Sequence, residues 1–271
     1  MEIIGYAFAL LIGLLLGLVG GGGSIMAVPI FVYIFGFSPT LAITYSLFVI
    51  GITAGIGAFD FQRKKLLDFK IALLFTIPSV CSVYFTRKYI LPLIPEEIFE
   101  YQNFILTKNI LIMVCFSLLM ISSACYMLIQ KETLRKLWKQ KEQSVHYQNY
   151  YLVVLEGLIV GIITGFIGAG GGFMIIPALV GFAGLTMKKA IGTSLFIISI
   201  NSIVGFLTDY YLNISFNWRI LLLFTFFAIC GIILGSKVSD NIENASLKKS
   251  FGYFTLIIGI IIILKELFYL V

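Results

Sequence analysis

The chain is built from long apolar stretches separated by short polar connections. Stretches almost free of charge cover residues 3–19, 40–59, 109–129, 219–236 and 250–264. Each is long enough to cross about 30 Å of hydrocarbon as an α-helix. A helix satisfies its own backbone polar groups in lipid, whereas the alternation with a period of two that a membrane barrel needs is absent. The pattern therefore predicts an all-α, polytopic helical membrane bundle.

The second feature is an internal repeat. The block Gly13-x-x-x-Gly17-Leu-Val-Gly20-Gly-Gly-Gly23-Ser24-x-Met26-x-x-Pro29 recurs 148 positions later as Gly161-x-x-x-Gly165-Phe-Ile-Gly168-Ala-Gly-Gly171-Gly172-x-Met174-x-x-Pro177. The same offset relates Gly36 to Gly184 and Gly57 to Gly205 without a gap. Two copies of a unit with a glycine break inside an apolar segment are typical of transporters built from repeats.

Each repeat combines one glycine-broken segment with three expected transmembrane helices. The first repeat, 1–129, contains the broken segment 3–36 and spans near 39–59, 71–86 and 109–129. The second, 151–271, contains the broken segment 151–184 and spans near 188–207, 219–237 and 250–270. The hydrophilic segment 130–150 joins them and carries five basic residues, which favour a cytoplasmic connector.

The basic residues favour opposite orientations for the two repeats. The loop 61–70 contains Arg63, Lys64, Lys65 and Lys70, whereas the matching loop 208–218 contains Asp209 and no basic residue. The positive-inside rule then places four loops in the cytoplasm: 61–70, 130–150, 184–190 and 238–249. Outside lie both termini and the loops 37–40, 87–109 and 208–218. This count requires re-entrant broken segments and inverted repeats; discontinuous helices that cross once would give parallel repeats instead.

Composition supports a multi-pass protein of the inner or plasma membrane. Hydrophobic residues make up 60% of the chain and charged residues 12%, about half the usual share for a soluble domain. The net charge of +6 comes from the loops and does not indicate nucleic acid. The four cysteines and the single His146 form no metal-ligand pattern, and no cofactor motif occurs. Because the acidic Glu2 stands where a signal peptide needs basic residues, we expect the first helix to be retained.

The two glycine runs are the strongest candidates for substrate contact. A short helix that starts after each break points its free N–H groups and positive dipole end into the break, which favours an anion. The predicted substrate-binding residues in the runs are Gly20, Gly21, Gly22, Gly23, Ser24, Gly168, Gly170, Gly171 and Gly172. The competing interpretation is close helix packing, which we expect for the pairs Gly13/Gly17, Gly161/Gly165, Gly51/Gly55 and Gly231/Gly235.

Polar residues in the expected spans add further candidates. Ser46, Ser194 and Asn201 are predicted to complete an anion cage, although serines can also bond to their own helix carbonyls. Glu156 is the acidic residue expected within the membrane and is the candidate proton carrier. Asp60 and Asp209, at span ends, are expected to face water. No Arg or Lys is expected in the apolar core, so recognition would rest on neutral dipoles.

The paired blocks GLVGGGGSIMAVPI and GFIGAGGGFMIIPALV resemble those of the sulfite exporter TauE/SafE family of bacterial and archaeal membrane proteins. The resemblance covers nearly the whole chain. It implies transport of small sulfur-containing anions such as sulfite or sulfonates, without naming the anion or the direction.

Three functional classes compete for this sequence. A secondary carrier of a sulfur-containing anion, working by alternating access and coupled to protons through Glu156, agrees best with the glycine runs and with the lack of an ATP-binding segment. The alternative is an anion channel in which the glycine loops form a static filter. An enzyme is not expected, because the chain offers no His/Cys/Asp/Glu cluster and no soluble domain.

Overall fold

The protein is described from a computed structural model that covers residues 2–101, 104–129, 150–168, 171–181, 183–211, 216–238 and 244–269. Gly170 and His146 lie outside these residues, as does nearly all of the connector 130–150. The chain forms two compact units, one made of Met1–Leu93 with Asn149–Ile242 and the other of Ile94–Gln148 with Glu243–Val271.

The first unit is entirely helical in its described parts. From the first half of the chain it takes α1 (Glu2–Val19), the 3₁₀ helix η1 (Gly21–Met26), α2 (Ala27–Tyr33), α3 (Pro39–Arg63), α4 (Phe69–Phe85), the π-helix η2 (Thr86–Ile90) and α5 (Leu91–Leu93). From the second half it takes α8 (Tyr150–Ile167), α9 (Gly172–Gly181), α10 (Met187–Tyr210) and α11 (Trp218–Val238). These bounds follow the predicted segments closely.

Matched residues shape the helix ends in both halves. Gly20 and Gly168 have φ of 73° and 70°, and Gly36 and Gly184 have φ of 72° and 67°; each pair is related by the repeat offset. This left-handed conformation strains any residue with a Cβ, so glycine is needed there. Asp68 and Asn217 cap α4 and α11, their side chains accepting from Ile71 N and Ile220 N.

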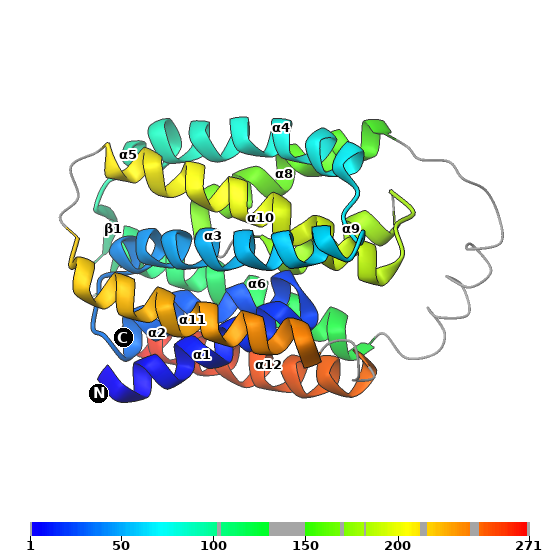
Figure 1. The fold of residues 1–271 in the computed structure, drawn as a ribbon. Helices are drawn as coiled ribbons and strands as arrows, with labels where there is room; N and C mark the ends of the chain where they lie inside the picture. The colour runs from blue at the N-terminus through cyan, green and yellow to red at the C-terminus, as the bar shows by residue number, and fades with distance from the viewer. Residues whose placement is uncertain are drawn as a thin grey trace. The chain divides into compact units, whose positions relative to one another are not determined.

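Three helix pairs build the first unit, each joining one half of the chain to the other. They are α3 with α10, α1 with α11 and α4 with α8. The start of α3 meets the end of α10 through Thr44 and Asp209, and Gly192 near the start of α10 meets Phe61 near the end of α3. The two central helices therefore run antiparallel (Figure 1).

The outer helices extend this opposite arrangement. Helix α4 and its continuation run parallel to α10. Asn201 bonds Ser79, and further toward the C-terminal end of both, Asp209 pairs with Arg87. Helix α11 runs parallel to α3, since Tyr45 accepts from Asn217 N at one end and Lys64 bonds the Ser236 carbonyl at the other. Because α3 and α10 are antiparallel, α4 and α11 also run in opposite directions (Figure 1).

Small residues let the outer helices approach closely, as the glycine spacing predicts. A Cβ added to Gly17 would lie 2.7 Å from the Ile232 carbonyl oxygen, and one added to Gly231 would overlap the Leu10 carbonyl oxygen. In the α4–α8 pair, Gly157 and Gly161 lie against the carbonyls of Phe75 and Ser79 in the same way. The packing role predicted for Gly13/Gly17, Gly161/Gly165 and Gly231/Gly235 is therefore confirmed.

The start and the end of the first glycine-broken segment are in contact. The ring of Phe35, just after α2, contacts Gly5 and Tyr6 near the start of α1. In the second half, Lys70 at the start of α4 donates to the Tyr150 hydroxyl at the start of α8. Asp68, two residues before Lys70, donates its backbone N–H to the Thr193 hydroxyl near the start of α10. The starts of α8 and α10 therefore lie at the same end of the unit. Helix α9 connects directly to α10, so α8 starts and α9 ends at the same end of the unit.

The second unit contains a β-hairpin and two helices. Strands β1 (Glu97–Tyr101) and β2 (Phe104–Thr107) pair antiparallel, and α6 (Lys108–Ile129) packs along α12 (Asn244–Tyr269). The structure differs from the expected loop over 87–109, since residues 86–93 continue the helix and residues 97–101 and 104–107 form strands. Aromatic and β-branched residues such as Ile98, Phe99 and Ile105 in the sequence favour strands there.

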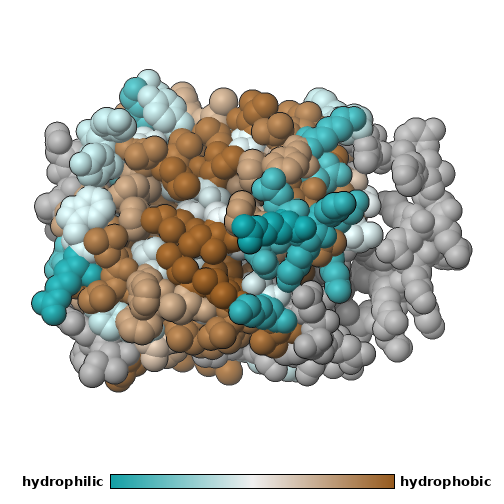
Figure 2. Space-filling view, viewed as in Figure 1, coloured by the Kyte–Doolittle hydropathy of each residue, from teal (hydrophilic) through white to brown (hydrophobic). Residues whose placement is uncertain are grey.

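The described surface supports a multi-pass membrane protein. Among the described residues, five helices are long and apolar enough to cross a membrane: Pro39–Arg63, Phe69–Leu93, Tyr150–Ile167, Lys188–Tyr210 and Trp218–Val238. Figure 2 shows hydrophobic side chains across the middle of one face and hydrophilic ones gathered toward its right-hand side. Large apolar residues such as Ile77, Phe226 and Leu222 are exposed along the helices, as lipid contact requires.

Candidate functional site

The two glycine runs meet inside the first unit. A Cβ added to Gly21 would overlap Gly172 Cα, and one added to Gly172 would overlap Gly21 Cα. The runs thus touch backbone to backbone, a contact that only glycine permits. In this conformation the contact is closed at Gly21 and Gly172, so the close-packing interpretation accounts for these two residues.

Gly20 and Gly168 turn the chain into the runs. Their positive φ angles follow directly after α1 and α8. A Cβ on Gly20 would lie 3.1 Å from Ile176 and Ile191, and one on Gly168 would overlap Ile43. Each turn is therefore enclosed by apolar side chains that come largely from the other half of the chain.

The first run carries little polar side-chain chemistry. Ser24 is buried, and its hydroxyl donates to the Gly21 carbonyl at 2.7 Å. Gly23 packs on α1, where an added Cβ would lie 2.7 Å from Leu16 N. Gly22 lies within η1, between Gly21 and Gly23. The first run is thus held mainly by backbone packing.

The second run has a hydroxyl beside it. Gly171 has a φ of 64°, and a Cβ placed there would overlap Thr164 Oγ1 on α8. Thr164 is buried, and its hydroxyl has no hydrogen-bond partner among the described residues. Helix α9 begins at Gly172, where its first N–H groups lack acceptors within the helix. Gly170 lies outside the described residues.

The predicted serine and asparagine candidates occupy three different places. Ser46 is buried and donates to the Gly168 carbonyl at 2.8 Å, so it supports the second run directly. Ser194 is buried and donates to the Ile191 carbonyl of its own helix. Asn201 donates to Ser79 Oγ at 2.6 Å, while its Oδ1 has no partner in the described chain. Of these three, only Ser46 is bonded to a described residue of a run.

Glu156 lies near the start of α8, where it is half-buried. One of its carboxylate oxygens is shielded from solvent without a hydrogen-bond partner among the residues described. Its neighbour Gly157 packs against Phe75 and Pro78 of α4. Along the chain, Glu156 lies more than two helical turns before the second glycine run, which starts at Gly168.

A buried ion pair lies beside the second run, and its presence corrects three expectations. Arg87, expected in an outside loop, is 2% exposed, and Asp209, expected to face water, is 3% exposed. The expectation that no Arg or Lys enters the apolar core is therefore wrong. Arg87 Nε donates to Asp209 Oδ1 at 2.7 Å, and Nη2 pairs with Oδ2. Both residues stand at the ends of apolar runs, a position that reads as water-facing from sequence.

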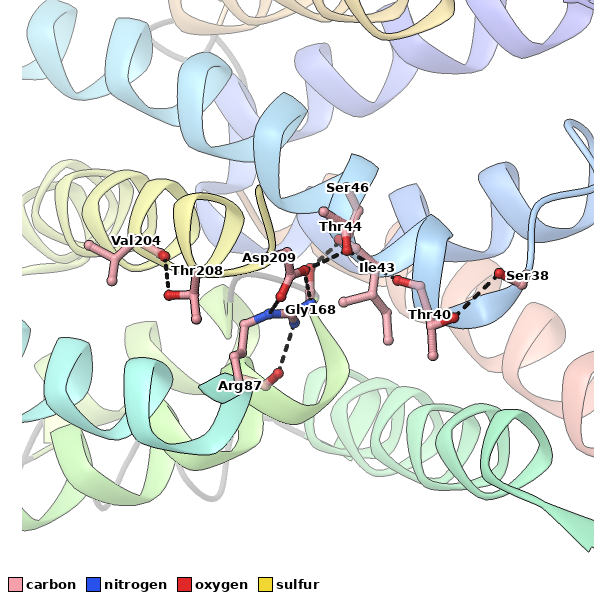
Figure 3. Close-up of polar contacts among 11 residues, drawn as sticks. Ser38, Thr40, Ile43, Thr44, Ser46, Arg87, Gly168, Val204, Thr208 and Asp209 are labelled. Carbon is pink, nitrogen blue, oxygen red and sulfur yellow. Dashed lines mark hydrogen bonds and ion pairs between the residues drawn. The ribbon is translucent and has the colours of Figure 1, made fainter. Parts of the chain in front are cut away.

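The ion pair ties four helices together (Figure 3). Arg87 extends from η2, and its Nη1 donates to the Gly165 carbonyl of α8 at 2.9 Å. Asp209 comes from α10 and also accepts from the Thr44 hydroxyl of α3. Gly165 lies within one helical turn of Gly168, whose carbonyl accepts from Ser46. The guanidinium is thus linked to the entrance of the second glycine run.

The part of the chain that the structure describes contains no group of three or more His, Cys, Asp or Glu residues able to hold a metal ion. The chemistry available at the glycine runs consists of backbone N–H groups, hydroxyls and one guanidinium. All three are hydrogen-bond donors, which suit an anion with several oxygen acceptors.

The chain is similar over nearly its whole length to a family of membrane transporter proteins. The family model described as "Sulfite exporter TauE/SafE" matches residues 6–262. A probable membrane transporter protein of Xylella fastidiosa strain Temecula1 is 26% identical over 263 residues, covering 94% of this chain and 92% of its own length. Probable membrane transporter protein YdhB of Bacillus subtilis strain 168 is 22% identical over 256 residues, covering 93% and 96%.

A shorter similarity with higher identity is found with probable membrane transporter protein MJ0441 of Methanocaldococcus jannaschii. It is 36% identical over 115 residues, which cover 38% of this chain and 40% of that protein. No solved structure matches the chain. Since the family model spans almost every described element from α1 to α12, the chain belongs to the sulfite exporter TauE/SafE family.

Proposed function

We propose that the protein is a secondary transporter of small sulfur-containing anions, such as sulfite or a sulfonate, and works by alternating access around its paired glycine runs. Membership of the sulfite exporter TauE/SafE family supports the class of anion. The observation that carries the mechanism is the meeting of Gly21 and Gly172, which brings two helix starts together inside the helical unit. Helix starts are anion sites made from backbone.

The arrangement of the helices favours inverted repeats. The matched helices α3 and α10 run in opposite directions, and so do α4 and α11. Each broken segment turns back toward the end at which it began, which supports the re-entrant alternative over a discontinuous crossing helix. Re-entrant hairpins that enter from opposite ends suit a carrier, because rocking one repeat against the other can expose a central site to each side in turn.

The closed contact between the runs fits one state of such a cycle. Gly21 and Gly172 touch, leaving no space for an anion between their α-carbons. Substrate therefore binds after the two hairpins separate. Substitutions that merely enlarge Gly21 or Gly172 should block both the closed state and the exchange between states.

Basic residues support an orientation in which the N-terminus lies outside. Exposed Arg63, Lys65, Lys188 and Lys189 gather at the end where α3 finishes and α10 begins. This end is the cytoplasmic one by the positive-inside rule. Helix α1 runs parallel to α11 and starts at the opposite end. By the count of crossings, the C-terminus then lies outside as well.

Proton coupling is assigned to Glu156. A carboxylate within a membrane helix that has an unpaired, shielded oxygen suits a group that takes up and releases a proton. Replacing Glu156 by Gln removes the titration while keeping the shape. We expect flux to lose its dependence on a pH gradient, measured in proteoliposomes at several external pH values. Unchanged flux with unchanged pH dependence would remove Glu156 from the mechanism.

Flux of sulfite and of sulfonates into proteoliposomes tests the function. Saturable uptake that is accelerated by unlabelled substrate on the other side indicates a carrier. Conductance without exchange would indicate the channel alternative and rule out alternating access. Absence of flux for every sulfur-containing anion would overturn the proposed substrate class.

A further inference from the structure

The Arg87–Asp209 ion pair is not explained by stability. Both side chains are almost fully buried, at 1% and 4% exposure. Desolvating a charge costs several kcal/mol per ion, and replacing a buried pair with apolar residues is often neutral or stabilising. Ionisable residues inside membrane helices are rare and mark the paths of ions and substrates. The pair therefore calls for a functional explanation.

The corresponding contact in the other half of the chain, between the ends of α3 and α11, is made without a buried ion pair among the described residues. Counted from the caps Asp68 and Asn217, Ser236 matches Arg87. Phe61 matches Asp209 at the repeat offset.

In place of the buried pair, Lys64 bonds the Ser236 carbonyl at 3.1 Å and pairs with Asp60 at 3.3 Å. The Lys64 and Asp60 side chains are 29% and 40% exposed. The fold thus does not need a buried ion pair at this position.

Arg87 lies where an anion at the second glycine run would approach. Its Nη1 bonds the Gly165 carbonyl, one helical turn before Gly168. Two buried hydroxyls without partners among the described residues flank this turn. They belong to Thr164, beside Gly171, and to Thr86, beside Gly165. The guanidinium, these two hydroxyls and the N–H groups at the start of α9 are all hydrogen-bond donors, which suit an oxyanion.

We infer that the Asp209 carboxylate is an internal stand-in for the substrate, occupying donors on Arg87 that a sulfur oxyanion takes during transport. The inference rests on the proposed function and assigns a substrate-binding role to Arg87. A carboxylate and a sulfite or sulfonate group each offer two oxygens to the fork of a guanidinium. The Thr44 hydroxyl already donates to Asp209 and remains a hydrogen-bond partner for the carboxylate when the substrate displaces it from Arg87.

Competition between the two anions gives the inference its measurable consequence. While the Asp209 carboxylate occupies Arg87, the substrate anion is excluded. The apparent affinity for the anion therefore equals the intrinsic affinity multiplied by the fraction of time for which Arg87 is free. Asp209→Asn removes the competing charge, so anion binding tightens by about tenfold or more. Arg87→Gln abolishes binding. Arg87→Lys weakens it, because an ammonium lacks the two-pronged geometry.

The experiment is calorimetric titration of the purified full chain in detergent with sulfite and with sulfoacetate. Thermal unfolding is recorded for every variant. The double variant Arg87→Gln/Asp209→Asn removes both charges, so it should fold better than Arg87→Gln alone yet still fail to bind the anions. Asp60→Asn and Lys64→Gln alter the exposed pair at the corresponding contact in the other half of the chain and should leave anion affinity unchanged.

Two results would overturn the inference. One is a double variant that binds sulfite or sulfoacetate like the unmodified protein, which would make the pair purely structural. The other is an Asp209→Asn variant whose affinity for every anion tested is unchanged. Phosphate and acetate are titrated in parallel: if Asp209→Asn tightens only these, the Arg87 site stands and the sulfur-anion class fails.

Discussion

At the scale of residues, the glycine runs act through what their missing side chains allow. Gly21 and Gly172 bring two backbones into contact, and Gly20 and Gly168 adopt positive φ. These are separate demands, one on space and one on conformation. A substitution can therefore be chosen to violate one without the other.

Gly21→Ala should abolish transport, because its Cβ meets backbone atoms of Gly172 that cannot move independently of α9. Gly172→Ala should have the same effect. Overpacking of this kind costs about 1–3 kcal/mol. Gly36→Ala is the control, since it has open space around it and costs only the strain of a positive φ, about 1–2 kcal/mol.

The measurement is flux in proteoliposomes normalised to the protein inserted. Gly21→Ala with normal flux, or Gly36→Ala with flux lost to the same extent, would contradict a specific role for the contact between the runs.

At the scale of elements, the π-helix η2 places the ion pair. A π-helical turn adds a residue to the helix repeat and changes the direction of the side chains that follow. Thr86 and Arg87 are buried at the start of η2, while Lys88 and Tyr89 are exposed. The continuation of α4 through η2 is thus what carries a charged residue into the core.

Helix α11 provides the test of element packing. Gly231→Leu should separate α11 from α1, because the side chain would collide with the Leu10 carbonyl and with Leu14 N. The expected loss is about 1–3 kcal/mol, seen as a lower midpoint of thermal unfolding in detergent. Leu222→Ala on the same helix is the control, since Leu222 is 56% exposed and should leave the midpoint almost unchanged. An equal shift for both variants would contradict the packing role.

At the scale of the molecule, opposite helix directions and the clustering of basic residues predict which loops share a side. Lys65 follows α3 at the basic end of the first unit, and Asn217 precedes α11 at the other end. A membrane-impermeant thiol reagent applied to intact cells should therefore label Asn217→Cys and not Lys65→Cys.

Both variants are made in a chain whose four native cysteines are replaced, and inverted membrane vesicles serve as the control. Labelling of both positions from the same side would rule out the proposed arrangement of the repeats. Labelling of Lys65→Cys alone in intact cells would keep the arrangement and reverse its orientation.

The sequence by itself determined the helical class, most of the helix bounds and the family. Apolar length and the glycine spacing depend on local chemistry, so α1, α3, α8, α10 and α11 begin and end close to where the pattern predicts. The packing of Gly13, Gly17, Gly231 and Gly235 was also predictable, because small residues at a spacing of four form one helix face.

The tertiary structure alone decided which residues surround the second glycine run. Arg87 and Asp209 lie 122 positions apart, and their pairing depends on the parallel packing of α4 and α10. Each reads singly as a charge at the end of a span, where water is the default partner. Their burial follows from the helices that converge on them, and no local pattern encodes that convergence.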